Sequence, residues 1–388
     1  MPALSFTRRF QRWQLRVAKG DRLALAQGIL PVLLVGLFVW GLLGLRKPPA
    51  TSVLHPNTPF LAPLNAGVAF SSVVAANGSI STFSESFPQH GVDSLPGLHL
   101  RLENPRLLAQ EGSREKDSVL LVVVFKDSES WGEGRSVEDF FKLVNSFEYP
   151  KAKISIAMLT SSMSEFSHAK ALFQRHIQQF ARLSVLFRND FSQQGQAFAR
   201  EDRHDDELQT NRRRILARYR NFALLSTLET WHQHVVWLDA DVHVVPADLM
   251  KRMIHSGRDI VEPMCVRMKE TGTGWYEYDL NAWVGRRKMR RALDNPDNFV
   301  PGDLSVKRMR QFHGGLQTFV PLDSVGGTML YVNAEVHRQG VLFPVHYLIG
   351  NEWTGEGYDG IETEGLCYAA HFLGFKCWGM PNDLIYHI

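Results

Sequence analysis

The sequence predicts an α/β fold with a mixed, mainly parallel sheet, preceded by one transmembrane helix. Several short, wholly apolar runs are typical of strands buried on both faces of a parallel sheet, and helical patterns separate them. A longer uncharged run lies near the N-terminus between basic residues. Hydrophobic residues make up 44% of the 388 residues, which is enough for a large core in one or two domains.

The uncharged run extends from Leu23 to Leu45, and about 20 apolar residues suffice to cross a bilayer as a helix. It is longer than the apolar region of a signal peptide, and no small-residue cleavage site follows. The residues before it are strongly basic: Arg8, Arg9, Arg12, Arg16, Lys19 and Arg22 stand against one acid, Asp21. The positive-inside rule therefore places the N-terminus in the cytosol and the rest of the chain across the membrane.

These patterns predict a cytosolic tail at 1–22, a signal anchor at 23–45, a stem at 46–112 and one folded domain at 113–388. The stem is rich in Pro, Ser, Asn and Gly, as linkers are. Asn77-Gly78-Ser79 is a glycosylation acceptor if this side faces a secretory lumen. The net charge of +3 gives no reason to expect binding to nucleic acid.

Three apolar runs, 118–125, 154–159 and 182–187, predict the first parallel strands, with helical patterns after the first two. Ser164 is expected to cap the second of these helices. Polar residues stand where the strands end, namely Lys126, Asp127, Ser161 and Asp190. Since the carboxyl ends of parallel strands share one edge, we expect these side chains to face a common crevice. Each of them is also an ordinary turn residue.

The segment from His234 to Pro246 carries the strongest motif. An apolar run ends in Asp239-Ala240-Asp241, and residues two apart in an extended chain point to the same side. Two carboxylates at the end of a buried strand suit Mg²⁺ or Mn²⁺, particularly a metal shared with a diphosphate. The alternative is a turn with two solvated aspartates.

A helix expected at 211–226 leads into this strand and begins with a basic cluster. Its members are Arg212, Arg213, Arg214, Arg218 and Arg220. Arginine donates in a planar fork that matches phosphate, so Arg220 and the adjacent Asn221 are candidate donor-binding residues. The alternative is a solvated charged face. A second basic run, Arg286 to Arg291, is interpreted as a solvated face or a subunit contact.

Gly326-Gly327 opens an apolar strand at 328–332, and adjacent glycines there often mark close approach of the backbone to a ligand; a β-bulge is the alternative. Glu362 and Glu364 begin a helix that ends near Leu373, and they either contact substrate or are plain partners of the helix dipole. The three cysteines are interpreted as buried thiols. If one pair forms, Cys367 with Cys377 is favoured by proximity.

Several segments together resemble a known family. The Arg220-Asn221 pair, VVWLDAD at 235–241, YDLNAW at 278–283, SVGGTMLYVNAEVHRQG at 324–340, WTGEGYDGIETEG at 353–365 and WGMPNDLIYHI at 378–388 carry the likeness. They are similar to the donor-binding core of A-type glycosyltransferases, and in combination they resemble the fungal Golgi mannan polymerase subunits, glycosyltransferase family 62. The resemblance covers the chain from about 118 onward. It implies a Rossmann-like A-type fold and retaining α-1,6-mannosyl transfer from GDP-mannose with Mn²⁺.

The resemblance also assigns roles. Asp239 and Asp241 hold the metal, and His387 completes its shell. Asp279 lies near the sugar and, with Glu362 and Glu364, is a candidate catalytic residue. The strand ends, the arginine cluster and the acidic motif described above supply the donor-binding candidates, which are Lys126, Asp127, Ser161, Arg212, Arg220, Asn221 and Asp239. The acceptor would be an α-mannoside of an N-glycan, and the partners would be other mannan polymerase subunits in the Golgi membrane.

Two alternatives to this mannosyltransferase remain open. In the first, the chain is a structural subunit with little or no activity that supports a catalytic partner. In the second, the fold is the same but the donor is a UDP-sugar instead of GDP-mannose.

Overall fold

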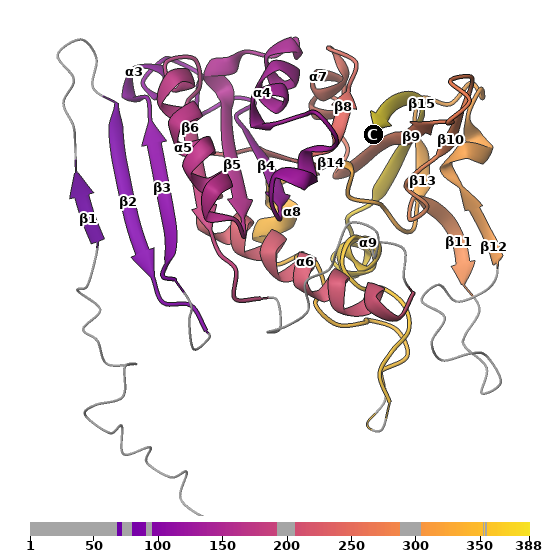
Figure 1. Ribbon diagram of the computed structural model, residues 1–388. Coiled ribbons are helices and arrows are strands. Elements are labelled where there is room, and N and C mark those ends of the chain that lie inside the picture. The colour runs from indigo at the N-terminus through magenta and orange to yellow at the C-terminus, as the bar shows by residue number, and fades with distance from the viewer. Residues whose placement is uncertain are drawn as a thin grey trace, which may run out of the picture. The chain divides into compact units, whose positions relative to one another are not determined.

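The computed structural model describes residues 68–71, 80–90, 95–191, 206–287, 304–351, 353 and 355–388. They belong to one unit, Gly67–Ile388, in which helices cover both faces of a mixed sheet (Figure 1). The strands are β1 (Val68–Ser71), β2 (Ser81–Phe87), β3 (Gly97–Glu103), β4 (Val119–Phe125), β5 (Ile154–Thr160), β6 (Arg182–Phe187), β7 (His234–Leu238), β8 (Val242–Val244), β9 (Ile260–Met268), β10 (Trp275–Glu277), β11 (Trp283–Arg287), β12 (Leu304–Arg308), β13 (Val320–Leu322), β14 (Met329–Asn333) and β15 (Cys377–His387).

The helices are α3 (Pro105–Leu108), α4 (Val137–Ser146), α5 (Met163–His176), α6 (Asp206–Thr227), α7 (Leu249–Ile254), α8 (Ala334–Arg338) and α9 (Thr363–Phe372), with short 3-10 turns η2 (Ser128–Trp131), η3 (Lys151–Lys153) and η5 (Met309–Phe312). The main sheet has the order β1-β2-β3-β6-β5-β4-β7-β14-β9-β15-β13, while β10 pairs with β9 and β8 with β15. Strands β11 and β12 form a separate pair.

The centre of the sheet is parallel and its flanks are mostly antiparallel. Strands β6, β5, β4 and β7 run in one direction, in the third-second-first-fourth order of a Rossmann-like half. Strand β14 joins β7 antiparallel, β9 follows antiparallel, and β15 lies parallel to β9. The predicted mainly parallel sheet is therefore found at the centre only, because the second half of the chain adds strands in the opposite direction.

The central strands form where the sequence is continuously apolar. All seven residues of β5 and six of the seven of β4 are buried, and their branched side chains suit a sheet covered on both faces. On one face they pack with α4, α5 and α7 in one core. On the other face they pack with α6, α8 and α9 in a second core. The N-cap of α5 is Ser162, whose hydroxyl accepts from the Glu165 N–H at 3.3 Å, and not Ser164 as predicted, because the helix begins two residues earlier.

Part of the segment predicted as stem lies in the sheet. Strands β1, β2 and β3 all fall within residues 46–112, and β3 pairs antiparallel with β6 along its length. In β3 the buried side chains alternate with partly exposed ones along most of the strand. That period of two is shorter and weaker than the apolar runs of the centre, which is why composition alone indicated a linker.

A disulfide joins α9 to β15, between Cys367 and Cys377, whereas Cys265 is a buried free thiol. The preferred interpretation of three buried thiols was therefore wrong, and the pair favoured by proximity forms. Cys367 and Cys377 are only ten residues apart, and the short turn between α9 and β15 brings their sulfur atoms together.

Several expectations fall outside the described residues. They concern the tail at 1–22, the anchor at 23–45, the acceptor Asn77 and most of the basic run at 286–291. In the part of the chain that the structure describes, no helix has both the length and the apolar character needed to span a membrane.

Candidate active site

The Asp239-Ala240-Asp241 turn begins directly after the central strand β7. The Asp239 N–H donates to the Thr328 carbonyl at 2.9 Å, which extends the pairing of β7 with β14 by one step. The Val242 N–H then closes the turn on the Asp239 carbonyl at 3.3 Å. The Asp239 side chain is 37% exposed, and that of Asp241 only 9%. The motif therefore presents one accessible and one buried carboxylate at the carboxyl edge of the sheet.

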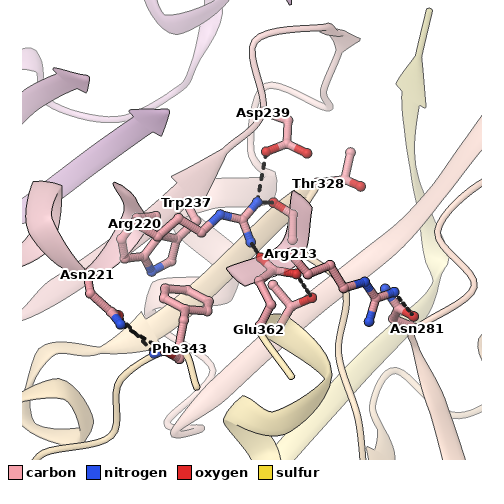
Figure 2. A network of polar contacts seen from close by, with 12 residues as sticks. Arg213, Arg220, Asn221, Trp237, Asp239, Asn281, Thr328, Phe343 and Glu362 are labelled. Carbon is pink, nitrogen blue, oxygen red and sulfur yellow. Dashed lines mark hydrogen bonds and ion pairs between the residues drawn. The ribbon is translucent and has the colours of Figure 1, made fainter. Parts of the chain in front are cut away.

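Arg220 connects this turn to the start of α9 (Figure 2). Its guanidinium, on a residue only 3% exposed, donates to Asp239 Oδ1 at 3.1 Å and to the Gly327 carbonyl at 3.3 Å. It also donates to Glu362 Oε1, and Glu362 is itself buried. Burial lowers the pKa of Arg220, but the Coulomb attraction of Glu362 and Asp239 outweighs it and leaves the pKa raised. Arg220 is thus a permanent cation between two acids.

The two acids differ in how they are held. Glu362 adopts a backbone φ of +58°, which is unfavourable for a residue with a Cβ and is maintained only by its surroundings. Its N–H donates to the Pro344 carbonyl at 2.9 Å, and Oε2 accepts from Thr363 Oγ1 at 2.9 Å. Although the Asp239 side chain is partly exposed, its partial desolvation, together with repulsion from Asp241 and Glu362, raises its pKa to about 7 despite the opposing effect of Arg220 and His387.

Asp241 meets His387 from the last strand. His387 Nε2 lies 3.0 Å from Asp241 Oδ2, and both residues are buried. Strand β15 is brought here by its antiparallel pairing with β8, in which His387 faces Val242. The Tyr278 ring stacks on the imidazole, with centroids 3.7 Å apart. The structure therefore joins two residues that are 146 positions apart in the chain (387 − 241).

Asp279 lies between β10 and β11 and contacts the turn that precedes β14. Its Oδ2 accepts from the Gly327 N–H at 3.1 Å and from Thr328 Oγ1 at 3.0 Å, and Oδ1 accepts from the Asn281 N–H at 3.1 Å. A Cβ at Gly326 would overlap the Asp279 carboxylate, and one at Gly327 would overlap the Arg220 guanidinium. The two glycines thus allow close approach, as expected at a strand start, but to the protein's own side chains.

Glu364 belongs to a neighbouring network. Arg213, on α6, donates to Glu364 Oε2 at 3.3 Å and to Asn281 Oδ1 at 3.1 Å (Figure 2). Because Asn281 also donates its N–H to Asp279, the two networks adjoin. Glu364 is 2% exposed. Two arginines of the cluster on α6, Arg213 and Arg220, therefore pair with buried acids, and they lie seven residues apart on the same helix.

The remaining donor-binding candidates lie in two other places. Lys126, Asp127 and Ser161 adjoin where β4 and β5 end: the Lys126 Nζ is 3.4 Å from Asp127 Oδ2, and the Ser161 hydroxyl donates to the Lys126 carbonyl at 3.2 Å. Asn221 instead exchanges two hydrogen bonds with the backbone of Phe343, at 2.8 and 2.9 Å (Figure 2). Arg212 is half-buried near the start of α6.

Arg135 is a site neighbour that no pattern in the sequence indicated. Its guanidinium donates to three backbone carbonyls: Trp131 at 2.9 Å, Ala240 at 3.4 Å and Val242 at 3.2 Å. It therefore links the loop after β4 to the middle of the acidic turn and to the residue that follows it. A single arginine in a Gly-rich loop carries no periodicity or motif, so only its contacts identify it.

Two carboxylates and an imidazole are a suitable donor set for Mn²⁺. Among the described residues, however, no group of three or more His, Cys, Asp or Glu side chains is arranged as a metal site. Asp239 is engaged by Arg220, and His387 by Asp241. A metal bound here would have to replace the contact between His387 and Asp241, because the metal needs the imidazole nitrogen Nε2 that now faces the Asp241 carboxylate.

Comparison with known proteins identifies the family to which the chain belongs. Residues 99–346 match the model of the Anp1 family. The mannan polymerase complex subunit mnn9 of Schizosaccharomyces pombe is 27% identical over 293 residues, which cover 71% of this chain and 81% of that one. The vanadate resistance protein of Candida albicans is 30% identical over 219 residues (53% and 47%). The VAN1 subunit of the mannan polymerase I complex of Saccharomyces cerevisiae is 31% identical over 215 residues (52% and 38%).

A solved structure, the mannosyltransferase PcManGT from Pyrobaculum calidifontis in complex with GDP-Man and Mn²⁺, is similar at 13% identity and a TM-score of 0.41, over 73% of this chain and 61% of that one. A TM-score below 0.5 does not establish a common fold, so the ligands of that protein say nothing about this chain.

Proposed function

This chain belongs to the Anp1 family, as its sequence motifs predicted, and from that premise we propose that it is a metal-dependent, retaining α-1,6-mannosyltransferase. It takes mannose from GDP-mannose and adds it to the α-1,6-mannan backbone of N-glycans as a subunit of a mannan polymerase complex. The observation that carries the proposal is the Asp239–Arg220–Glu362 network at the end of the central parallel strand, beside the Asp241–His387 pair. The Rossmann-like strand order supports an A-type fold.

In this proposal Asp239, Asp241 and His387 hold Mn²⁺, which supplies positive charge for the leaving diphosphate. Arg220 keeps Asp239 in place from the protein side, because its other contacts are buried and fixed. A carboxylate offers about four acceptor sites, and Asp279 uses three of them on its own chain. The remaining site on Oδ1 is available to a sugar hydroxyl, which gives Asp279 a role in orientation.

We further propose that the chain is a single-pass type II protein of the Golgi membrane, with residues 1–22 cytosolic and the folded domain lumenal. The basic residues before the anchor support this orientation. The Cys367–Cys377 disulfide supports an oxidising compartment for the folded domain.

Transfer is tested with the full-length chain in detergent, given GDP-mannose, an α-mannoside primer and Mn²⁺. Asp239→Asn and Asp241→Asn are expected to lower turnover at least about a hundredfold, because each removes charge that the reaction needs as the diphosphate leaves. Asp248→Asn, at an exposed ion pair on α7, is the matched control and should retain wild-type turnover. Normal turnover in either site variant would contradict the proposal.

The second candidate is a structural subunit with little or no activity. It is favoured by the contacts that Arg220 and His387 make with the two aspartates, and by relatives named as complex subunits. In that case the wild-type chain is inactive alone, and both aspartate variants still support the activity of a co-purified partner. A thermal shift with GDP or UDP, each with Mn²⁺, identifies the donor base, since a hundredfold excess over Kd stabilises by about 2.7 kcal/mol.

A further inference from the structure

The turn at residues 326–328 forms hydrogen bonds with three residues of the candidate site, namely Asp279, Arg220 and Asp239. The Gly327 N–H and the Thr328 hydroxyl donate to Asp279. The Gly327 carbonyl accepts from Arg220, and the Thr328 carbonyl accepts from the Asp239 N–H. Three residues of the site therefore take their positions from this short piece of backbone. A shift of the turn would move all three together.

Glu262 holds the remaining end of the turn. It lies on β9, is 1% exposed, and its Oε2 accepts from the Gly326 N–H at 2.8 Å. Its other oxygen, Oε1, is buried with no hydrogen-bond partner among the described residues. The charged groups that act on it are both acids, Asp279 and Glu277. A buried carboxylate without a cation is costly, whereas the neutral acid is tolerated.

We propose that Glu262 is a positioning residue of the transferase site, a neutral acid that fixes the Gly326–Thr328 turn and through it Asp279, Arg220 and Asp239. This inference rests on the proposed function for its kinetic test, but not for its structural one. Burial and the repulsion of Asp279 raise the pKa of Glu262 well above its usual value, in agreement with the missing cation. An ionised Glu262 would push against Asp279 across Gly326.

The proposal distinguishes three substitutions. Glu262→Gln keeps an oxygen that accepts from Gly326 and stays neutral, so its turnover should remain within about threefold of wild type. Glu262→Ala leaves the buried Gly326 N–H without an acceptor. Glu262→Asp is shorter by one methylene and cannot reach the same nitrogen. Both are expected to lower kcat by about tenfold or more, as loss of a supporting residue typically does, with a smaller change in KM for GDP-mannose.

Glu277→Ala is the matched control. Glu277 is also a buried acid near Asp279, but it accepts from the Arg310 N–H at 3.0 Å and does not contact the turn. It should keep its turnover, whereas equal losses in Glu277→Ala and Glu262→Ala would overturn the proposal. The pH profile of Glu262→Gln should match wild type. A lost limb, or a loss of turnover as large as in Asp239→Asn, would mean that Glu262 acts as a charged catalytic group and would overturn the proposal.

Hydrogen exchange of the full-length chain tests the positioning without any reaction. The Gly326 amide should be protected from exchange in wild type and in Glu262→Gln, and should exchange at least about tenfold faster in Glu262→Asp. Glu262→Asp also serves as the test variant if Glu262→Ala does not fold. Unchanged protection in Glu262→Asp would overturn the inference. If wild type transfers no mannose yet the exchange result holds, the proposed function fails and the positioning of the turn by Glu262 stands.

Discussion

Strand β4 buries only apolar side chains, and β5 adds only two hydroxyl groups to them, whereas β9 and the start of α9 bury three carboxyl groups: Glu262, Glu362 and Glu364. The first two strands belong to the parallel centre of the sheet, and β9 to its antiparallel flank. The side chains of β4 and β5 therefore contribute mainly hydrophobic burial. The flank also buries apolar side chains, but its carboxyl groups must in addition be matched one by one by cations or hydrogen bonds. The candidate site lies where the two meet, and Arg220 joins them.

The largest expected effect comes from removing that junction. Arg220→Met leaves Glu362 buried without its cation, and breaking a buried pair on one side costs about 3–5 kcal/mol. Urea unfolding of the variant measures the loss. Adding Glu362→Gln removes the unpaired charge and should restore most of the stability. If the single variant loses less than about 1 kcal/mol, or the double variant recovers nothing, the pair does not link the two regions as described.

The contrast between the regions also explains what the sequence could reveal. Runs such as 118–125 and 154–159 are visible because a buried parallel strand is apolar throughout. The D-A-D turn is visible because two acids follow such a run. The partners of those acids are not visible, since the pairings of Asp241 with His387 and of Arg220 with Glu362 join residues more than 140 positions apart. The second half of the chain brings them together, through the end of β15 and the start of α9.

Sequence patterns also did not identify Glu262 and Arg135 as residues of the candidate site. Glu262 stands in the middle of β9, where an isolated acid in an apolar strand has no motif to identify it. Arg135 contacts three backbone carbonyls, and backbone contacts leave no signature in side-chain spacing. The family resemblance supplied His387 and Asp279 because it preserves long-range relations that periodicity does not contain.

Two buried histidines, His99 in β3 and His337 in α8, allow the stability of two parts of the molecule to be compared as the pH changes. Burial lowers the pKa of His99 to about 4, with help from Arg101 and Arg182, and burial lowers that of His337 to about 4 as well. Both are neutral when folded, so the unfolded chain binds more protons between about pH 6.5 and 4. The free energy of unfolding should therefore fall as pH drops through this window, by on the order of 3 kcal/mol for each histidine.

Urea unfolding between pH 7 and 4 measures this slope. His99→Gln and His337→Gln should each flatten it, since glutamine does not titrate. Trp237 Nε1 donates to His337 Nε2 at 3.3 Å, an acceptor that protonation of the ring would remove. If His337→Gln flattens the slope and His99→Gln does not, then β3 unfolds separately from the rest of the sheet.

The smallest of these effects concerns the disulfide between α9 and β15, which ties down the start of β15, the strand that ends at His387. Cross-linking two positions ten residues apart stabilises by about 2–3 kcal/mol in the chain-entropy treatment. The Cys367→Ala, Cys377→Ala double variant should lose this amount, and a thiol reductant should then change nothing further. Because β4 and β5 are held by hydrophobic burial, hydrogen exchange should quicken in α9 and β15 and stay slow in the parallel strands. Equal acceleration in both regions would mean that the antiparallel flank and the parallel centre unfold as one unit.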